Sequence, residues 1–345
     1  MKLLVTGGCG FIGSTFTRRR LAGTDDIVTN LDALTYAGNR ANLREFEGNA
    51  RYRFAHGRIE DAAAVKDAMS GADAVVHFAA ESHVDRSIDD AAPFITTNVL
   101  GTQVLLDAAR KVGVERFVHV STDEVYGALG AEGKFTEATP FRPRSPYAAS
   151  KASGDLLAQA YWETYHLPVM VVRPSNNYGP YQFPEKFIPV MVTNLVEGRK
   201  VPVYGRGENV RDWLYVEDCC RAIELVLARG RPGEAYNVGG ESERCNVDVA
   251  KMVVRQMGLG EDSIEYVADR PGHDFRYALD NTKIRHELSW RPENSFEEGL
   301  NRTVDWYRAH SDWWRPLKAR LARESEGFWT GMDKNGDRRP KKEDR

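Results

Sequence analysis

The chain has 345 residues, of which 42% are hydrophobic and 28% are charged, both ordinary values for a globular protein. Its 47 lysines and arginines stand against 50 acids and give a formal charge of −3, so the charge balance offers no case for a nucleic-acid partner. The length suits one large domain or two closely joined ones, and no uninterrupted apolar stretch is long enough to cross a bilayer.

Short apolar runs alternate with helical patterns along the first half of the chain, as in proteins that alternate strand and helix. Several of these runs are apolar throughout, which is typical of strands covered on both faces. The pattern predicts an α/β fold with a doubly wound parallel sheet of Rossmann type. We expect strands over Lys2–Thr6, Ile27–Asp32, Arg51–His56, Ala74–Phe78, Arg116–Ser121 and Val169–Arg173, and helices over Phe11–Leu21, Asn98–Val112 and Tyr147–Tyr165.

A glycine-rich loop follows the first expected strand and opens the first expected helix. Gly7 permits a tight turn, Gly10 lets backbone amides approach a pyrophosphate, and Gly13 allows close packing of helix on strand. The helix N-terminus adds unpaired N–H groups and a positive dipole end. Asp32 ends the second strand at about the distance expected of a ribose-binding acid, and its charge would repel a 2′-phosphate. These features predict NAD rather than NADP.

Three polar residues, Thr122, Asp123 and Glu124, follow the expected strand Arg116–Ser121. Ligands gather at the carboxyl ends of parallel strands, so these residues are expected in the ligand site. Thr122 is placed to hydrogen-bond a substrate hydroxyl. Neighbouring carboxyls in a loop are usually solvated, but in a ligand site two carboxyls can divide into an acid and a base.

Tyr147 and Lys151 lie four residues apart and therefore share one face of the expected helix, which Ser145 and Pro146 are suited to begin. A phenol with a pKa of about 10 is a poor base at neutral pH. An adjacent ammonium, an oxidised nicotinamide and the helix N-terminus would all favour the phenolate, and Tyr147 could then take a proton from a substrate hydroxyl. Such pairs also arise by chance on surface helices.

Beyond residue 174 the loops lengthen, and prolines and glycines cluster. We predict an NAD-binding domain over residues 1–174 that includes the catalytic residues, and a smaller α/β substrate-binding region over residues 175–330. Residues 331–345 are dense in charge and are expected to be a disordered tail.

The cysteines and the first residues bear on the compartment. Cys9, Cys219, Cys220 and Cys245 show no metal-ligand spacing, so we expect reduced thiols, no metal site and a cytoplasmic location. No signal peptide is expected, because Met1–Val5 runs directly into the glycine loop.

Several segments, taken together, resemble the extended short-chain dehydrogenase/reductase superfamily and, more narrowly, the dTDP-glucose 4,6-dehydratases. The resemblance runs from Met1 to about Arg320. The acid pair in the fourth segment separates dehydratases from the related epimerases. The segments are TGGCGFIG (6–13), LDALTYAGN (31–39), FAAESHVDRSI (78–88), STDEVYG (121–127), SPYAASK (145–151), RPSNNYGPYQFPEKFIP (173–189), NVRDWLYVED (209–218) and RPGHDFRYALD (270–280).

The resemblance implies that dTDP-glucose is converted to dTDP-4-keto-6-deoxyglucose with NAD as cofactor and no net change of redox state. Tyr147, helped by Thr122 and Lys151, removes the C4 hydroxyl proton while hydride passes from C4 to NAD+. The 4-ketone acidifies C5, so Glu124 abstracts the C5 proton as Asp123 protonates the departing C6 hydroxyl. Hydride then returns to C6 and a proton to C5.

The resemblance also implies the residues that line the site. Arg211 is expected to grip the diphosphate by charge-assisted hydrogen bonds, and His83 is given no catalytic role. On the cofactor side the residues are Gly7, Gly10, Phe11, Ile12, Gly13, Asp32, Thr35, Ile59, Ala79, Ala80, Tyr147 and Lys151. On the sugar and phosphate side they are Ser82, His83, Asp85, Ser87, Thr122 and Asn176, and along the nucleoside diphosphate they are Lys186, Phe187, Tyr204, Arg211, Asn246, Arg270 and Tyr277.

One departure concerns the adenine. The family usually carries Asp-Ile where this chain has Arg58-Ile59, so the acid that meets the adenine amino group is missing and Ile59 is left to pack on the ring.

Two alternative functions remain. One is another nucleotide-sugar enzyme on the same scaffold, either a 4-epimerase or a dehydratase of a UDP-sugar, since thymine and uracil differ by one methyl worth only about 1–3 kcal/mol. The other is a non-catalytic NAD-binding scaffold or sensor, because fold does not guarantee activity. The resemblance further implies a homodimer packed through the helices near Asn98–Val112 and Tyr147–Tyr165, and no nucleic-acid or membrane partner is expected.

Overall fold

Seven strands form one parallel sheet in a computed structural model that describes residues 1–269 and 274–329. The strand order reverses its direction of growth between β1 and β4, which creates the switch point where open α/β sheets bind ligands. Across the sheet the order is β10 (Ala235–Val238), β6 (Val169–Pro174), β5 (Arg116–Val120), β4 (Ala74–His77), β1 (Lys2–Thr6), β2 (Ile27–Asp32) and β3 (Tyr52–His56), and every neighbouring pair is parallel.

Both faces of the sheet are covered by helices, which is why its central strands are apolar throughout. Successive side chains of β1 enter opposite cores: Leu3 and Val5 pack on one face and Leu4 on the other. The first face carries α1 (Phe11–Gly23), α8 (Val216–Arg229) and α10 (Thr282–Leu288). The second face carries α2 (Ala62–Ala68), α5 (Thr102–Val112) and α6 (Pro146–Tyr165).

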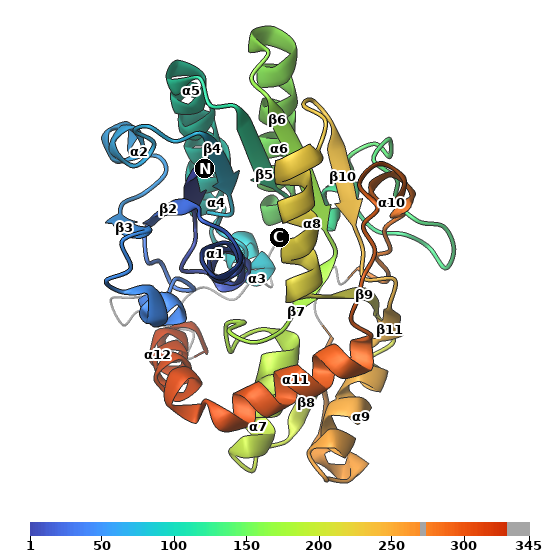
Figure 1. Cartoon of the computed structure of the whole chain (residues 1–345). Helices are drawn as coiled ribbons and strands as arrows, with labels where there is room; N and C mark the ends of the chain where they lie inside the picture. The colour runs from blue at the N-terminus through green and yellow to red at the C-terminus, as the bar shows by residue number, and fades with distance from the viewer. Residues whose placement is uncertain (270–273, 330–345) are drawn as a thin grey trace.

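A smaller region lies below the sheet in Figure 1 and has a core of its own, which includes Met191, Trp213, Val253 and Val304. Its strands are β7 (Asn176–Tyr178), β9 (Val210–Tyr215) and β11 (Glu243–Cys245) in one sheet, and β8 (Val201–Tyr204) and β12 (Ile264–Val267) in another. Its helices are α7 (Phe187–Val196), α9 (Asn246–Gln256), α11 (Phe296–Ala309) and α12 (Ser311–Trp329). Short helical segments complete the chain: η1 (Arg40–Phe46), α3 (Val84–Asp89), α4 (Ala92–Phe94), η3 (Asp123–Tyr126) and η4 (Glu261–Ser263).

The predicted Rossmann-type fold with a smaller C-terminal α/β region is confirmed, but the two parts interleave. β10 pairs with β6, and α8 packs on the same sheet, although both follow residue 174. A boundary at that residue therefore separates most, rather than all, of the large sheet from the smaller region. Sequence reasoning missed β10 because it has only four residues and includes the polar Asn237.

The helix expected over Asn98–Val112 is present, but its first part is not α-helical. Residues Ile95–Gly101 form a wider π-helical turn, η2, and the α-helix begins at Thr102. The Asn98 amide both donates to and accepts from the backbone of Glu81 at 2.9 Å, and it donates to the Ser150 hydroxyl at 2.8 Å. These bonds tie the turn to α6 and to the loop after β4.

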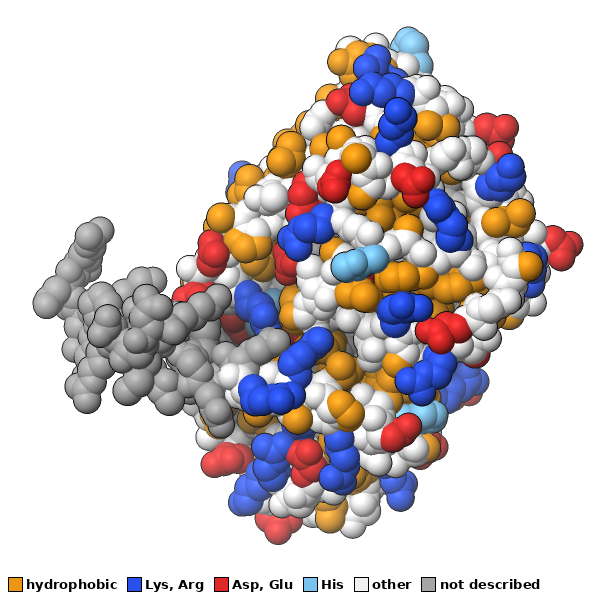
Figure 2. Space-filling model, turned by 90° about the vertical axis from the view of Figure 1, so that its left-hand side faces the viewer, with side chains coloured by type: hydrophobic (Ala, Val, Ile, Leu, Met, Phe, Trp, Pro, Cys, Tyr) orange, Lys and Arg blue, Asp and Glu red, His pale blue; other side chains and the backbone are white. Residues whose placement is uncertain are grey.

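The face of the molecule shown in Figure 2 is mixed in charge. Figure 2 shows acidic and basic side chains interspersed over the face that it displays. Within the described ranges, no helix combines the length and the apolar character needed to span a membrane. The predicted tail over residues 331–345 and the candidate Arg270 lie outside the described residues.

Candidate active site

The glycine loop leaves no room for side chains at two of its glycines, Gly7 and Gly13. Gly7 has φ +70°, and a Cβ at this position would lie 2.6 Å from the backbone nitrogen of Ala79. A Cβ on Gly13 would lie 2.3 Å from the carbonyl oxygen of Gly7. Gly10 caps α1 without any side-chain hydrogen bond, so the first N–H groups of the helix point into the loop without a capping acceptor. This is the geometry of a pyrophosphate site.

Asp32 stands at the carboxyl end of β2, beside that loop. Its Oδ2 accepts from the backbone N–H of Cys9 and its Oδ1 from that of Leu34, both at 2.8 Å. Burial raises the pKa of Asp32, and the two backbone hydrogen bonds oppose that rise. The carboxylate thus fastens the glycine loop to β2 and borders the place where the predicted ribose hydroxyls would lie.

One cleft runs over the carboxyl ends of the strands and contains all twelve residues predicted for the cofactor side. We call it the cofactor cleft. Its predicted members are Gly7, Gly10, Phe11, Ile12, Gly13, Asp32, Thr35, Ile59, Ala79, Ala80, Tyr147 and Lys151. The tight glycine loop, the open helix N-terminus and the strand-end acid fit an NAD molecule. Within the described ranges, no group of three or more His, Cys, Asp or Glu side chains could hold a metal ion.

Sequence reasoning missed part of this cleft. Tyr36, Gln182 and Phe183 also line it, and the rings of Tyr36 and Phe183 meet edge to face with their centroids 5.6 Å apart. All three belong to segments already quoted for the family resemblance, but neither spacing nor polarity marked them as cleft residues. Where the adenine is predicted, Arg58 pairs with Glu60, their Nε and Oε1 atoms 2.5 Å apart, while Ile59 is buried.

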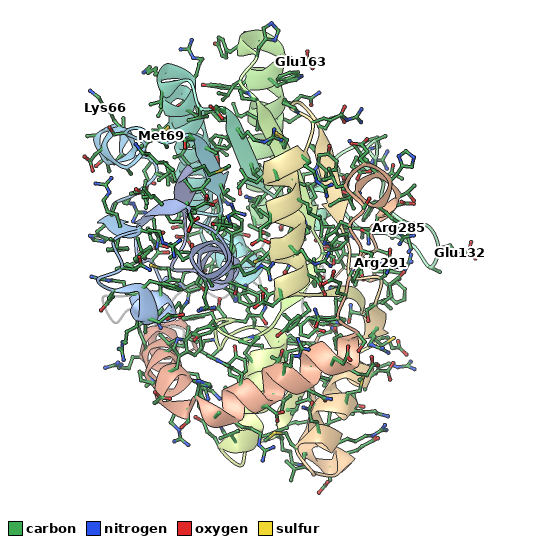
Figure 3. The ribbon with its side chains drawn as sticks, viewed as in Figure 1. Lys66, Met69, Glu132, Glu163, Arg285 and Arg291 are labelled. Atoms are coloured by element: carbon green, nitrogen blue, oxygen red, sulfur yellow. The ribbon has the colours of Figure 1, made fainter. Side chains whose placement is uncertain are left out.

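Tyr147 lies in the first turn of α6, where Ser145 caps the helix by accepting from the Ala148 N–H at 3.1 Å. Lys151 follows one turn later, and its Nζ donates to the carbonyl oxygen of Val120 at 2.8 Å. Because Val120 is the last residue of β5, this bond fixes the lysine at the strand end. In Figure 3, Glu163 near the carboxyl end of α6 lies at the top, so the amino end that carries Tyr147 is directed into the middle of the molecule.

The protein alone does not make Tyr147 acidic. Burial and the negative charge of Glu124 raise the pKa of Tyr147, and the Thr122 hydroxyl lowers it by hydrogen bonding. Burial also lowers the pKa of Lys151 to about 8. In the chain without ligands, desolvation therefore outweighs the effects of the lysine and the helix end, and the prediction of a phenolate depends on the oxidised nicotinamide as well.

The acid pair lies in η3, directly after Thr122. The Thr122 hydroxyl caps η3 by accepting from the Glu124 N–H at 3.3 Å, and it donates to Asp123 Oδ1 at 3.2 Å. Burial, with the charges of Glu124 and Asp212, raises the pKa of Asp123 to about 8. Asp123 Oδ2 is buried and has no hydrogen-bond partner among the described residues. Asp123 is therefore a carboxylic acid at neutral pH with one oxygen free for a ligand.

A half-buried cation, Arg211, faces this pair from the smaller region. The Arg211 guanidinium stacks on the ring of Tyr277 at 4.7 Å and donates to the carbonyl oxygen of Asp274 at 3.0 Å. Burial lowers the pKa of Arg211, while the charges of Glu124 and Asp123 oppose that shift. Arg211 and Tyr277 thus lie within electrostatic reach of the acids, as a substrate bound between the two regions requires.

The other residues predicted on the sugar and phosphate side differ in position and in contacts. Ser82 lines the cofactor cleft, with its carbonyl oxygen 3.5 Å from Lys186 Nζ. His83 begins α3, and its Nε2 lies 3.6 Å from a carboxylate oxygen of Glu185. Ser87 is buried and its hydroxyl donates to the Val84 carbonyl at 2.6 Å, which ties it to its own helix. Asp85 lies in the first turn of that helix.

The candidates of the smaller region also differ in exposure. Asn176 opens β7, and its Oδ1 has no hydrogen-bond partner among the described residues. Phe187 opens α7 and stacks on Trp213 with centroids 6.0 Å apart. Tyr204 is exposed at the end of β8, and Asn246 begins α9. The roles of all these residues stay predictions.

Known proteins match this chain over nearly its whole length. A protein-family model described as GDP-mannose 4,6 dehydratase matches residues 4–303. The dTDP-glucose 4,6-dehydratase of Streptomyces niveus is 54% identical over 324 residues, covering 92% of this chain and 96% of that protein. The Escherichia coli protein of the same name is 49% identical and covers 91% and 96%. The crystal structure of the dTDP-glucose 4,6-dehydratase DesIV from Streptomyces venezuelae, with NAD and dTDP bound, superposes with a TM-score of 0.90 at 55% identity and covers 92% of this chain and 100% of that one.

Proposed function

The chain belongs to the dTDP-glucose 4,6-dehydratases of the extended short-chain dehydrogenase/reductase superfamily, and we propose from this membership and from its site that it converts dTDP-glucose to dTDP-4-keto-6-deoxyglucose. It is an NAD-dependent hydro-lyase of deoxysugar synthesis. The observation that carries the proposal is Asp123, a buried carboxyl with a pKa of about 8 next to a second carboxyl. An elimination needs such a proton donor at neutral pH, whereas a 4-epimerisation does not.

The first stage is the oxidation of C4. Bound NAD+ supplies a hydride acceptor for C4 and, as NADH, a hydride donor for C6. Tyr147 takes the proton of the C4 hydroxyl, and the Thr122 hydroxyl, which lowers the pKa of Tyr147, supports the phenolate. Lys151 adds a positive charge one turn along the same helix. The glycine loop and Asp32 hold the cofactor from the opposite side of the cleft.

The second stage is the elimination of water. The 4-ketone makes the C5 proton acidic, and Glu124 removes it as a carboxylate. Asp123, whose pKa of about 8 keeps it protonated, gives its proton to the departing C6 hydroxyl. Glu124 then returns a proton to C5. Two neighbouring residues can take opposite roles because Asp123 is more deeply desolvated.

The smaller region supplies the residue that binds the diphosphate of the substrate. Arg211, held by Tyr277 and the Asp274 carbonyl, presents a guanidinium suited to a diphosphate. The nucleotide base is selected by a small difference, because one methyl separates thymine from uracil. A UDP-glucose dehydratase is therefore the second candidate, distinguished by the experiment below.

We also propose a cytoplasmic homodimer. All four cysteines are free thiols, which is usual in reducing compartments. The helices predicted to form the dimer carry exposed apolar side chains, among them Leu100 on η2 and Leu156 on α6, which are 50% and 55% exposed. Sedimentation equilibrium tests the dimer: Leu156→Glu should favour monomers, and a wild-type monomer at all concentrations would refute it.

The function is tested by mass spectrometry of the protein with dTDP-glucose, UDP-glucose and CDP-glucose in heavy water. Loss of water from dTDP-glucose, with deuterium at C5 and no net NADH, is expected. Glu124→Gln should abolish the deuterium incorporation. Loss of water only from another nucleotide sugar would change the substrate, inversion at C4 without loss of water would indicate an epimerase, and no reaction at all would favour a non-catalytic scaffold.

A further inference from the structure

The proposed reaction uses two groups of side chains that the fold carries on separate elements. Tyr147 and Lys151 act on C4 from the first turns of α6, whereas Asp123 and Glu124 act on C6 and C5 from η3. These three carbons are consecutive in one sugar, so both groups must reach their atoms while the substrate stays in one position. A misplacement of about 1 Å can lower a rate a hundredfold. The contacts that hold η3 against α6 therefore bear on the rate.

Hydrogen bonds through Arg173 join the two elements inside the protein. Arg173 belongs to β6 and is only 6% exposed. Its Nε donates to Oδ2 of Asp155 on α6, and its Nη1 donates to the hydroxyl of Tyr126 on η3, both at 2.8 Å. One guanidinium thus binds a carboxylate on one element and a phenol on the other. We call Arg173, Asp155 and Tyr126 the arginine clamp.

Each end of the arginine clamp lies close in the chain to one group of reacting residues. Asp155 follows Lys151 by four residues and therefore lies on the same face of α6. Tyr126 follows Glu124 by two residues and is the last residue of η3. A movement of Tyr126 away from Asp155 would therefore carry η3, with its two carboxyls, away from the helix face that bears Tyr147.

The ends of the clamp are themselves held firmly. The Tyr126 hydroxyl, which accepts from Arg173, also donates to Oδ1 of Asn237 at 2.8 Å. The ring of Tyr126 stacks on that of Phe135 with centroids 5.0 Å apart. Burial raises the pKa of Asp155, but the charge of Arg173 is the strongest opposing effect, and the pKa falls to about 2. Asp155 is therefore a carboxylate near neutral pH, and the ion pair is always formed.

Stability is a poor reason for such an arrangement. Removing two charges from water costs about as much as their attraction returns, so apolar side chains of the same volume often stabilise a core as well as a buried ion pair does. A guanidinium instead offers a planar fork of N–H groups that point in fixed directions. The fork sets the distance between acceptors on two different elements, which apolar packing does not.

Resting on the proposed function, we propose that Arg173, Asp155 and Tyr126 are positioning residues, which hold η3 where the elimination of water keeps pace with the oxidation of C4. They act through the acid pair and not on the substrate itself. The clamp bears on the second stage of the reaction in particular, because the element that it holds carries the acid pair. The first stage keeps its own support, since Lys151 remains bound to the Val120 carbonyl oxygen.

Tyr126→Phe tests the clamp because it removes one hydroxyl and keeps the ring that stacks on Phe135. The holoenzyme is mixed with dTDP-glucose in a stopped-flow spectrophotometer, where the absorbance of reduced nicotinamide reports the balance between the two stages. In Tyr126→Phe the rate of elimination should fall about ten- to a hundredfold, while hydride transfer from C4 keeps its rate. More reduced nicotinamide should then accumulate than in the wild type, and it should decay as product forms.

Tyr161→Phe is the matched control. The Tyr161 hydroxyl lies on the same helix, α6, and donates to Oδ1 of Asp107 at 2.8 Å, but Asp107 belongs to α5 and not to η3. This variant loses an equivalent hydrogen bond and should give the wild-type absorbance trace.

Arg173→Lys extends the test to the centre of the clamp. It keeps the charge but loses the planar fork, so it should accumulate reduced nicotinamide as Tyr126→Phe does. The double variant should eliminate water no more slowly than the slower single variant, because both substitutions break the same link.

The outcomes separate the clamp from the function on which it rests. Elimination at the wild-type rate in Tyr126→Phe, or oxidation of C4 slowed as much as elimination, would overturn the clamp even though product forms. The same accumulation in Tyr161→Phe would overturn it too, because any loss of a hydrogen bond on α6 would then suffice. If Tyr126→Phe does not fold, Arg173→Lys decides by the same comparison. Absence of both product and reduced nicotinamide from the wild type would instead refute the dehydratase.

Discussion

Asp123 links catalysis to stability in a way that can be measured. Its pKa is 3.8 without the fold and about 8 within it, because of burial and the charge of Glu124. Between these two pH values the folded chain keeps a proton that the unfolded chain has lost, so the free energy of unfolding falls as pH rises. Each pKa unit corresponds to about 1.4 kcal/mol, so the fall from pH 5 to pH 8 reaches about 4 kcal/mol at most. Above about pH 8 the loss is complete.

Asp123→Asn removes this titration. The stability of the variant relative to the wild type should therefore rise by up to about 4 kcal/mol between pH 5 and pH 8. Comparing two pH values cancels every pH-independent effect of the substitution, including the changed contact with Thr122. Urea unfolding of both chains without ligand, at several pH values, measures the difference. Asp123→Glu, which retains a carboxyl one methylene further from the backbone, is the matched control and should keep a pH dependence of the same sign.

The pKa of Asp123 also predicts how the rate of dehydration depends on pH. Dehydration by the wild type should fall as pH rises through about 8, where Asp123 loses its proton. Asp123→Asn should not dehydrate but should still oxidise C4, so that absorbance of reduced nicotinamide accumulates. The reasoning is refuted if Asp123→Asn and the wild type lose stability in parallel from pH 5 to pH 8. A wild-type rate that stays constant past that range would equally contradict the role of Asp123 as acid.

Three further substitutions test the rest of the site. Arg211→Lys keeps the charge but loses the planar contact with Tyr277. KM for dTDP-glucose should therefore rise about ten- to a hundredfold while kcat changes little. An equal fall in kcat and kcat/KM would instead assign Arg211 to the chemical step. Gly7→Ala brings a Cβ to 2.6 Å from the backbone nitrogen of Ala79. Calorimetry should therefore find weaker NAD binding and a lower Tm. An unchanged NAD affinity would contradict the proposed role of the loop. Asp32→Asn loses the charge that opposes a 2′-phosphate. Competition binding should then show the preference for NAD over NADP reduced by about 1–3 kcal/mol. An unaltered preference would mean that residues other than Asp32 select the cofactor.

Features that depend on a few neighbouring residues were predictable from the sequence alone. The glycine loop, Asp32 at a strand end and the pair Tyr147 and Lys151 each combine a residue type with a short spacing, and local backbone geometry then decides where they point. The α/β class was predictable for the same reason, because apolar runs alternate with helical patterns. The carboxyl ends of parallel strands necessarily lie at one edge, which brought Thr122 and the acids beside the cofactor residues.

Other features exist only in the folded chain. β10 joins the large sheet because β6 leaves an edge for it to pair with, which its own four residues do not announce. Phe183 lines the cofactor cleft because the loop between β7 and α7 brings its ring against Tyr36, which follows β2. Above all, the raised pKa of Asp123 comes first from burial, then from the charge of its neighbour Glu124 and that of Asp212, a residue of another strand. Sequence placed two carboxyls side by side, and desolvation by distant segments decides which of them keeps its proton.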